Sequence, residues 1–247
     1  MTAAKMQRAS VVHEIVRSWL RRNRRLAWVT AGLFVVGVVA VGMADAGGGE
    51  GGLAILVLYL PASLGLLLMS GVVSADLDSR LILIWYTKPG GLGRNLVQHY
   101  FLHQLLIGGI GLLSGGVAAA LALTRGVLPA DQIVRLPALA VALAVLPAAM
   151  VFAFSAWGSR RDSALALITI VAGIGLGGAV VFDAGFLRNL IMAIVFPMDA
   201  LQALGGAGPS ADALVANAAI LAAHLVAWTL LGVAGTRWLE RTLHRSL

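Results

Sequence analysis

Six apolar segments, each long enough to cross a lipid bilayer, constrain the fold of this chain more than any other feature. An α-helix needs about 20 predominantly apolar residues to cross the hydrocarbon core. Because lipid offers the backbone no hydrogen bonds, such segments satisfy their own polar groups by folding as helices. The segments are residues 26–44, 53–73, 96–123, 136–157, 164–182 and 213–235. The sequence therefore predicts an all-α, polytopic membrane protein with six transmembrane helices.

The composition agrees with this class and excludes others. The 247 residues are 60% hydrophobic and 12% charged, whereas soluble domains average about 45–50% apolar and about 25% charged residues. The formal charge is +7, but the cations cluster at the ends of the apolar segments, where membrane topology places them, so no nucleic acid is expected as a partner. The absence of cysteine excludes disulfides, thiolate metal sites and a cysteine nucleophile.

The distribution of lysine and arginine predicts how the chain is oriented. Loops on the cytoplasmic side of a membrane carry an excess of these residues. With six crossings, 15 of the 18 cations fall on one side, and only Arg125, Arg135 and Arg188 fall on the other. We therefore expect both termini in the cytoplasm.

Two segments outside the six spans have patterns of their own. In residues 1–25, apolar side chains at helical spacing share one face and basic side chains the other. This pattern predicts an interfacial helix among the lipid headgroups, either as an anchor alone or beside a partner's docking site. The outer connection, residues 183–212, contains an apolar piece at 186–196 that is too short to span and predicts a re-entrant hairpin before the last span. Residues 26–247 form one transmembrane domain.

No enzyme signature is complete in this chain. It lacks both the G-x-x-x-x-G-K-[ST] loop that binds ATP and the H-E-x-x-H motif of metalloproteases. His99 and His103 share a helical face, as a metal pair would, but Gln98 and Gln104 are poor further ligands. Interfacial hydrogen bonding is the better interpretation of the two histidines. We expect neither ATP hydrolysis nor a metal site in this chain.

Three polar residues in or near the last span are candidates for a substrate pathway. His224 lies midway along the sixth segment, Asn217 precedes it by two turns, and Asp199 lies in the outer connection. An ionisable residue within a membrane is a functional candidate, but a neutral histidine also joins helices by hydrogen bonds. Both interpretations of His224 stay open.

Glycines and prolines within the spans predict how the helices pack. Gly111 and Gly115 form a G-x-x-x-G pattern, as do Gly173 and Gly177. Such patterns permit close helix approach, within one chain or across a dimer. Two prolines, Pro61 and Pro147, each remove a backbone N–H, which frees a carbonyl and favours a kink.

The longest polar interruption, residues 74–95, lies on the predicted cytoplasmic side between the second and third spans. Two acids two positions apart open it, a short apolar segment follows, then a proline step, and a basic residue precedes the third span. The residues that carry this order are Asp76, Asp78, Arg80, Trp85, Lys88, Pro89 and Arg94.

This order of residues resembles the first cytoplasmic loop of the type-2 ABC exporter permeases, six-span subunits that work with a separate ATPase. In that family two acids open the loop, a mostly apolar helix and a proline follow, and basic residues open the third span. The amphipathic N-terminal helix and the re-entrant hairpin before the last span also have counterparts there. Arg80 stands where the family usually has glycine, and aspartate replaces the more usual glutamate at both acidic positions.

The resemblance implies the permease subunit of an ABC exporter in the bacterial inner (plasma) membrane. Residues 74–95 would be the coupling loop that docks on a cytoplasmic ABC ATPase. ATP and Mg²⁺ would be bound by that partner, and this chain would bind no cofactor. A second copy or a paralogue would complete a dimer surrounded by membrane lipids. Two other classes stay open: an ion- or proton-coupled secondary transporter, and a non-transporting membrane scaffold.

Overall fold

The computed structural model describes seven parts of the chain: residues 24–43, 50–70, 73, 91–157, 161–178, 197–206 and 210–246. Within those ranges the chain consists of helices and short turns, with no strand. The predicted interfacial helix (up to residue 23), most of the polar loop (74–90) and the predicted re-entrant piece (186–196) lie outside the described residues.

The described helices overlap all six predicted spans. They are α2 (Arg24–Met43), α3 (Glu50–Ala54), η1 (Ile55–Tyr59), α4 (Leu60–Met69), α7 (Gly91–Arg125), α8 (Ala130–Ile133), α9 (Leu136–Ala156), α10 (Asp162–Gly178), α12 (Met198–Gly205) and α13 (Ala211–Ser246).

Four stretches of the described chain are long and apolar enough to cross a membrane: Gly52–Met69, Gly93–Arg125, Ala130–Ala156 and Ala211–Thr242. The prediction of an all-α membrane protein with several spans is thereby confirmed. The helices α2 and α10 lie at the positions of the two other predicted spans, and α10 contributes a shorter apolar stretch.

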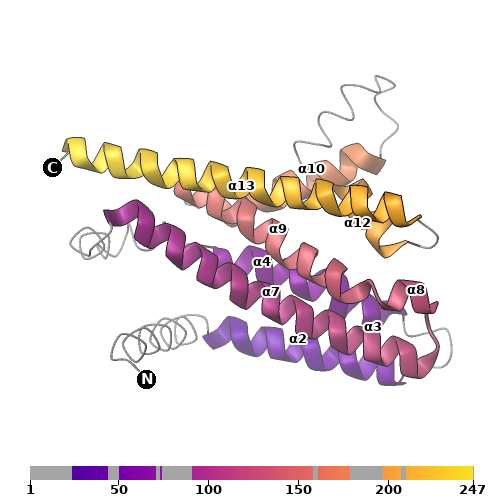
Figure 1. Ribbon diagram of the computed structural model, residues 1–247. Helices are drawn as coiled ribbons and strands as arrows, with labels where there is room; N and C mark the ends of the chain where they lie inside the picture. The colour runs from indigo at the N-terminus through magenta and orange to yellow at the C-terminus, as the bar shows by residue number, and fades with distance from the viewer. Residues whose placement is uncertain are drawn as a thin grey trace, which may run out of the picture.

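The long helices run between the two ends of an elongated bundle (Figure 1). The starts of α2 and α7 and the end of α13 lie together at one end, which we call the basic end because it carries Arg94, Arg237 and Arg241. The turn between α7 and α9, with Arg125 and Arg135, lies at the opposite end. This grouping agrees with the charge pattern from which the orientation was predicted.

Helix α9 is the centre of the bundle and packs against α4, α7, α10 and α13. Most of its side chains between Leu136 and Ala156 are buried, and many of them are alanine. In lipid there is little hydrophobic force between helices, so close backbone packing through small residues holds them together. An alanine-rich helix suits that central position.

Glycines on the neighbouring helices make this close packing possible. A Cβ atom built at Gly115 of α7 would lie 2.6 Å from the Cα of Pro137, and one at Gly111 would lie 3.0 Å from the carbonyl oxygen of Ala140. On α4, a Cβ at Gly65 would overlap the carbonyl oxygen of Ala144. The predicted G-x-x-x-G pattern of Gly111 and Gly115 therefore serves packing within the chain.

The second span contains a π-helical turn, η1, just before Pro61. The N–H of Leu60 donates to the carbonyl of Ile55, five residues earlier, and Pro61 has no N–H to offer the next carbonyl in that register. That next carbonyl belongs to Leu56, and the hydroxyl of Ser114 on α7 donates to it. The carbonyl that Pro61 was predicted to free is thus satisfied by a neighbouring helix, as lipid requires.

Two helices extend beyond their predicted spans at the basic end. Helix α7 begins at Gly91, so the last residues of the polar loop are helical. Helix α13 continues to Ser246, well past the predicted limit at residue 235, and its last turns carry Arg237 and Arg241. The polar, basic tail is therefore helical, although it continues no apolar pattern.

We predict that replacing Gly65 with alanine destabilises the bundle. The added methyl group would overlap the backbone of α9, and overpacking of this kind typically costs about 1–3 kcal/mol. The free energy of unfolding in mixed detergent micelles measures the effect. Gly116→Ala on α7 is the matched control, because a Cβ there meets nothing within 4 Å. Equal stability of the two variants would contradict the packing described for α4 and α9.

Candidate functional site

A groove between α7, α9 and α13 is a concave site in the described part of the chain. It encloses about 580 Å³, within the usual range of about 300–1,000 Å³ for small-molecule sites. Its walls are almost wholly apolar. The lining residues are Tyr100, Phe101, Gln104, Leu105, Gly108, Gly109, Leu112, Val141, Val145, Leu225, Val226, Thr229 and Leu230.

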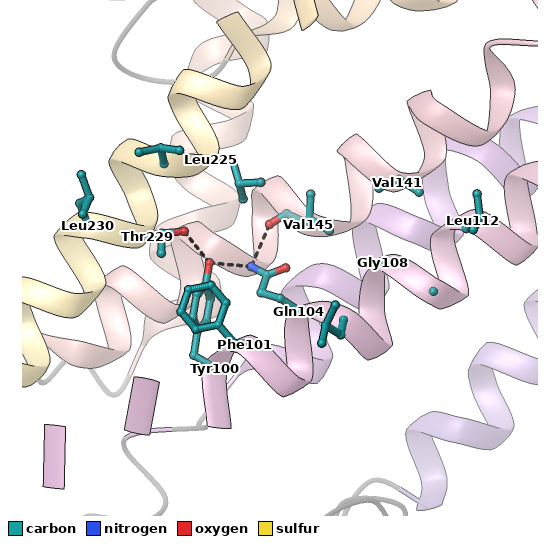
Figure 2. Close-up of a pocket in the computed structure, with 13 residues that line it drawn as sticks. Tyr100, Phe101, Gln104, Gly108, Leu112, Val141, Val145, Leu225, Thr229 and Leu230 are labelled. Carbon is teal, nitrogen blue, oxygen red and sulfur yellow. Dashed lines mark hydrogen bonds between the residues drawn. The ribbon is translucent and has the colours of Figure 1, made fainter. Parts of the chain in front are cut away.

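One chain of hydrogen bonds crosses the groove and joins all three helices (Figure 2). The hydroxyls of Tyr100 on α7 and Thr229 on α13 lie 2.7 Å apart. The side-chain amide of Gln104 donates to the Tyr100 hydroxyl at 2.9 Å and to the carbonyl of Val145 on α9 at 3.2 Å. Polar side chains within a membrane are commonly paired across helices in this way.

The Tyr100 ring is held in place by its neighbours. It stacks on Phe152 of α9, with ring centroids 4.0 Å apart and planes 16° from parallel. Phe152 in turn packs so tightly on α13 that a Cβ at Gly232 would overlap its ring. Tyr100 is only 1% exposed, so its hydroxyl is fixed at the floor of the groove.

This small polar cluster has unused hydrogen-bonding capacity. The Tyr100 and Thr229 hydroxyls carry two hydrogens, and the bond between them uses one. The Oε1 atom of Gln104 is buried and has no hydrogen-bond partner, which costs about 1–3 kcal/mol in an apolar site. The cluster therefore has one spare donor, and Gln104 Oε1 remains a buried acceptor.

The described residues at the two ends of the polar loop, which we call its bases, contact other helices. Ser70, at the end of α4, donates to Asp162 Oδ1 at 3.1 Å, and the same oxygen accepts the backbone N–H of Ser163 at 2.7 Å. At the other base, a Cβ atom at Gly93 would lie 2.8 Å from Glu240 Oε2. The end of α4 is thus tied to α10, and the start of α7 lies beside α13.

Of the residues predicted to contact an ATPase, the structure describes only Arg94, which is exposed on the first turns of α7. The remaining six lie outside the described residues: Asp76, Asp78, Arg80, Trp85, Lys88 and Pro89. The position of Arg94 at the basic end agrees with its predicted place between the loop and the third span.

The three candidates for a substrate pathway lie apart from one another. Asn217 is partly buried, and its side-chain amide donates to the carbonyl of Ala213 at 2.8 Å. His224 is 8% exposed, and its Nδ1 lies 3.0 Å from the carbonyl of Ile220. Asp199 is exposed on α12 near the opposite end.

His224 nevertheless has one unusual property. With the proton on Nδ1, which faces a carbonyl, its Nε2 is an acceptor, and that buried atom has no hydrogen-bond partner. His224 also lies next to Leu225 and Val226, which line the groove. The candidate therefore lies close to the groove without being among its lining residues.

Among the described residues, no three side chains come together in a way that would hold a metal ion. His103 Nδ1 lies 2.8 Å from the backbone carbonyl of His99, and the two rings lie 6.0 Å apart. The hydrogen-bonding interpretation of this pair fits those contacts.

Sequence reasoning missed Tyr100 and Thr229. Their signal was available, because a hydroxyl inside an apolar span needs a hydrogen-bond partner, but the sequence could not say which helices would supply it. Comparison with known proteins adds no relative: the chain matches no protein-family model, no curated protein and no solved structure.

We predict that Tyr100→Phe and Thr229→Val destabilise the bundle and do so non-additively. Each variant removes one end of the same hydrogen bond, and such bonds in membrane proteins contribute about 0.6 kcal/mol on average and up to about 1.7 kcal/mol. A double-mutant cycle on the free energy of unfolding isolates the coupling. Additive effects of the two changes would show that the hydroxyls do not interact.

Proposed function

We propose that this chain is the membrane-embedded permease of an ABC exporter, with six spans and both termini in the cytoplasm of a bacterial cell. A separate ATPase would bind ATP and Mg²⁺ and dock on the loop of residues 74–95. Two copies of the chain, or this chain and a paralogue, would form the translocation unit. The chain itself would carry no hydrolytic site.

The single observation that carries this proposal is the way the loop is anchored. Its first base is tied to α10 through Ser70 and Asp162, and its second base lies against Glu240 of α13. A force applied to the loop would act on α4, α7, α10 and α13 together, and all four pack on α9 or on each other. Alternating access in transporters needs this kind of rigid coupling between helices.

The charge pattern supports the same arrangement. The loop bases lie at the basic end, together with Arg94, Arg237 and Arg241. Under the positive-inside rule this end faces the cytoplasm, where ATP is available. Asp76 and Asp78 would then give the loop an acidic start that can pair with basic residues of a partner. Trp85 would supply a large apolar side chain to anchor the contact.

The outer side also fits the proposal. Helix α12, which follows the predicted re-entrant piece, packs against α9 and α13 through buried Ala200 and Leu201. Its end is held by Arg135, which donates to the carbonyl of Gly206 at 3.2 Å and pairs with Asp131 at 3.2 Å. A re-entrant hairpin enters the membrane and leaves it on the same side. Such a hairpin needs a returning segment packed at the outer end, and α12 is a short helix at that position.

A proton-coupled secondary carrier is the second candidate, because of one observation. His224 is an ionisable side chain inside the bundle whose buried Nε2 has no hydrogen-bond partner, and such residues within a membrane are functional candidates. In that case transport would follow the membrane potential or the pH gradient and would need no ATPase.

We predict that Asp76→Lys combined with Asp78→Lys abolishes docking of the ATPase. Reversing two charges at a charged interface places like charges together and should lower the amount of co-purified ATPase at least tenfold. The measurement is affinity purification of the chain from mild detergent, with the ATPase identified by its ATP hydrolysis.

Asp212→Lys is the matched control, since Asp212 is an exposed acid at the start of α13, far along that helix from the basic end. It should retain the ATPase, and both variants should insert into the membrane in equal amounts. Co-purification that survives the double reversal would contradict the docking role. Transport that continues without ATP and follows the membrane potential would favour the carrier.

A further inference from the structure

The groove between α7, α9 and α13 has the length of a lipid chain in one leaflet. Its lining on α7 runs from Tyr100 to Leu112, which corresponds to ~18 Å of helix at 1.5 Å per residue. One half of a ~30 Å hydrocarbon core is ~15 Å thick. The groove is also partly open at its side, and exposed apolar residues such as Leu105 and Leu230 form its edges.

Exposed arginines continue the same helix faces beyond the polar end of the groove. On α7, Arg94 precedes the lining residues Phe101 and Leu105 by seven and eleven positions, spacings that return to one helical face. On α13, Arg237 follows Val226 by eleven positions and lies on the same face. Arg241, one turn further, extends that stripe. All three arginines are exposed.

The vertical spacing of these groups fits a phospholipid. Arg94 lies six positions before Tyr100 and Arg237 eight positions after Thr229, or ~9 and ~12 Å along their helices. The headgroup region of a bilayer begins where the hydrocarbon ends and is about 5–8 Å thick on each side. An ester group at the level of Tyr100 and Thr229 would thus place its phosphate within reach of long arginine side chains.

The polar cluster supplies what an ester group accepts. Whichever hydroxyl donates in the Tyr100–Thr229 pair, one hydroxyl hydrogen is left without a protein acceptor. An ester carbonyl is an acceptor only, so it matches this spare donor. An acyl chain would then lie along Phe101, Leu105 and Gly109 toward Leu112, where the groove is apolar.

We propose that this groove binds an anionic phospholipid from the leaflet at the basic end. One acyl chain fills the groove, its ester carbonyl accepts the spare hydroxyl hydrogen, and its phosphate contacts Arg94, Arg237 and Arg241. The charge of the arginines selects an anionic headgroup over a zwitterionic one, since each arginine near a membrane surface contributes about 1 kcal/mol. The proposal does not depend on an ATPase or on transport.

The test is native mass spectrometry of the purified chain, titrated with dioleoyl phosphatidylglycerol or dioleoyl phosphatidylcholine. The wild-type chain should retain one tightly bound phosphatidylglycerol. Gly109→Leu should weaken that binding at least tenfold, because the new side chain occupies the space of several methylene groups, each worth about 0.8 kcal/mol. Gly109 lines the groove and a Cβ there meets nothing within 4 Å, so the backbone leaves room for a side chain at this position.

Gly116→Leu is the matched control, because Gly116 is on the same helix, is equally open and does not line the groove. It should bind phosphatidylglycerol as the wild type does. Tyr100→Phe combined with Thr229→Val removes both hydroxyls, and with them the spare donor, so this second variant should also weaken binding.

The headgroup preference is tested separately. Arg237→Ala with Arg241→Ala should lower the preference for phosphatidylglycerol over phosphatidylcholine by about 25-fold, or about fivefold per arginine. Arg125→Ala, at the opposite end, should leave the preference unchanged. Equal binding of both lipids by the wild type would overturn the proposal. Unaltered phosphatidylglycerol binding by Gly109→Leu would also overturn it. If that variant lost its dimer and still bound lipid, the groove would instead be a contact between two copies of the chain.

Discussion

Close packing of α9 against its neighbours is the constraint on which the rest of the structure depends. Between helices in lipid, burial of apolar surface gives little driving force, so van der Waals contact and hydrogen bonds must hold the bundle. The alanines of α9 and the glycines at positions 65, 111 and 115 bring backbones within contact distance. With α9 fixed in this way, α4, α7, α10 and α13 take their places around it.

The polar groups inside the bundle follow from the same constraint. A freed carbonyl or a buried hydroxyl in the hydrocarbon region cannot form a hydrogen bond with water, so it needs a partner within the protein. The hydroxyl of Ser114 donates to the carbonyl of Leu56 beside Pro61. The hydrogen bonds of Tyr100, Thr229 and Gln104 join three helices at the floor of the groove. In the described chain, the buried Oε1 of Gln104 and Nε2 of His224 remain without such a partner.

Much of the fold could be predicted from the sequence because length and hydropathy act locally. An apolar run of about 20 residues becomes a helix whatever its neighbours are, and each predicted span does coincide with a helix in the described chain. The extension of α13 to Ser246 was missed because its polar tail carries no apolar signal. The π-helical turn was missed too, and so was the bond that the Leu56 carbonyl accepts from Ser114, which lies far away in sequence.

The candidate site was harder to predict, for a physical reason. Tyr100 and Thr229 meet only because α7 and α13 both pack beside α9, and a sequence pattern does not specify which faces of distant helices meet. His224 and Asn217 were visible as polar residues within a span, but their nearest partners are carbonyls of their own helix. Gly108 and Gly109 line the groove, and sequence alone did not distinguish these from the glycines that pack helices.

The most direct test of the account is a photo-crosslink from the polar loop in living cells. A photoreactive amino acid in place of Trp85 should capture a P-loop ATPase, and it should do so from the cytoplasmic side of the membrane. The same probe at Arg125, at the opposite end of α7, should capture none. A probe at position 85 that reacts only with lipid, or that reagents reach solely from outside the cell, would contradict the proposed role of the loop.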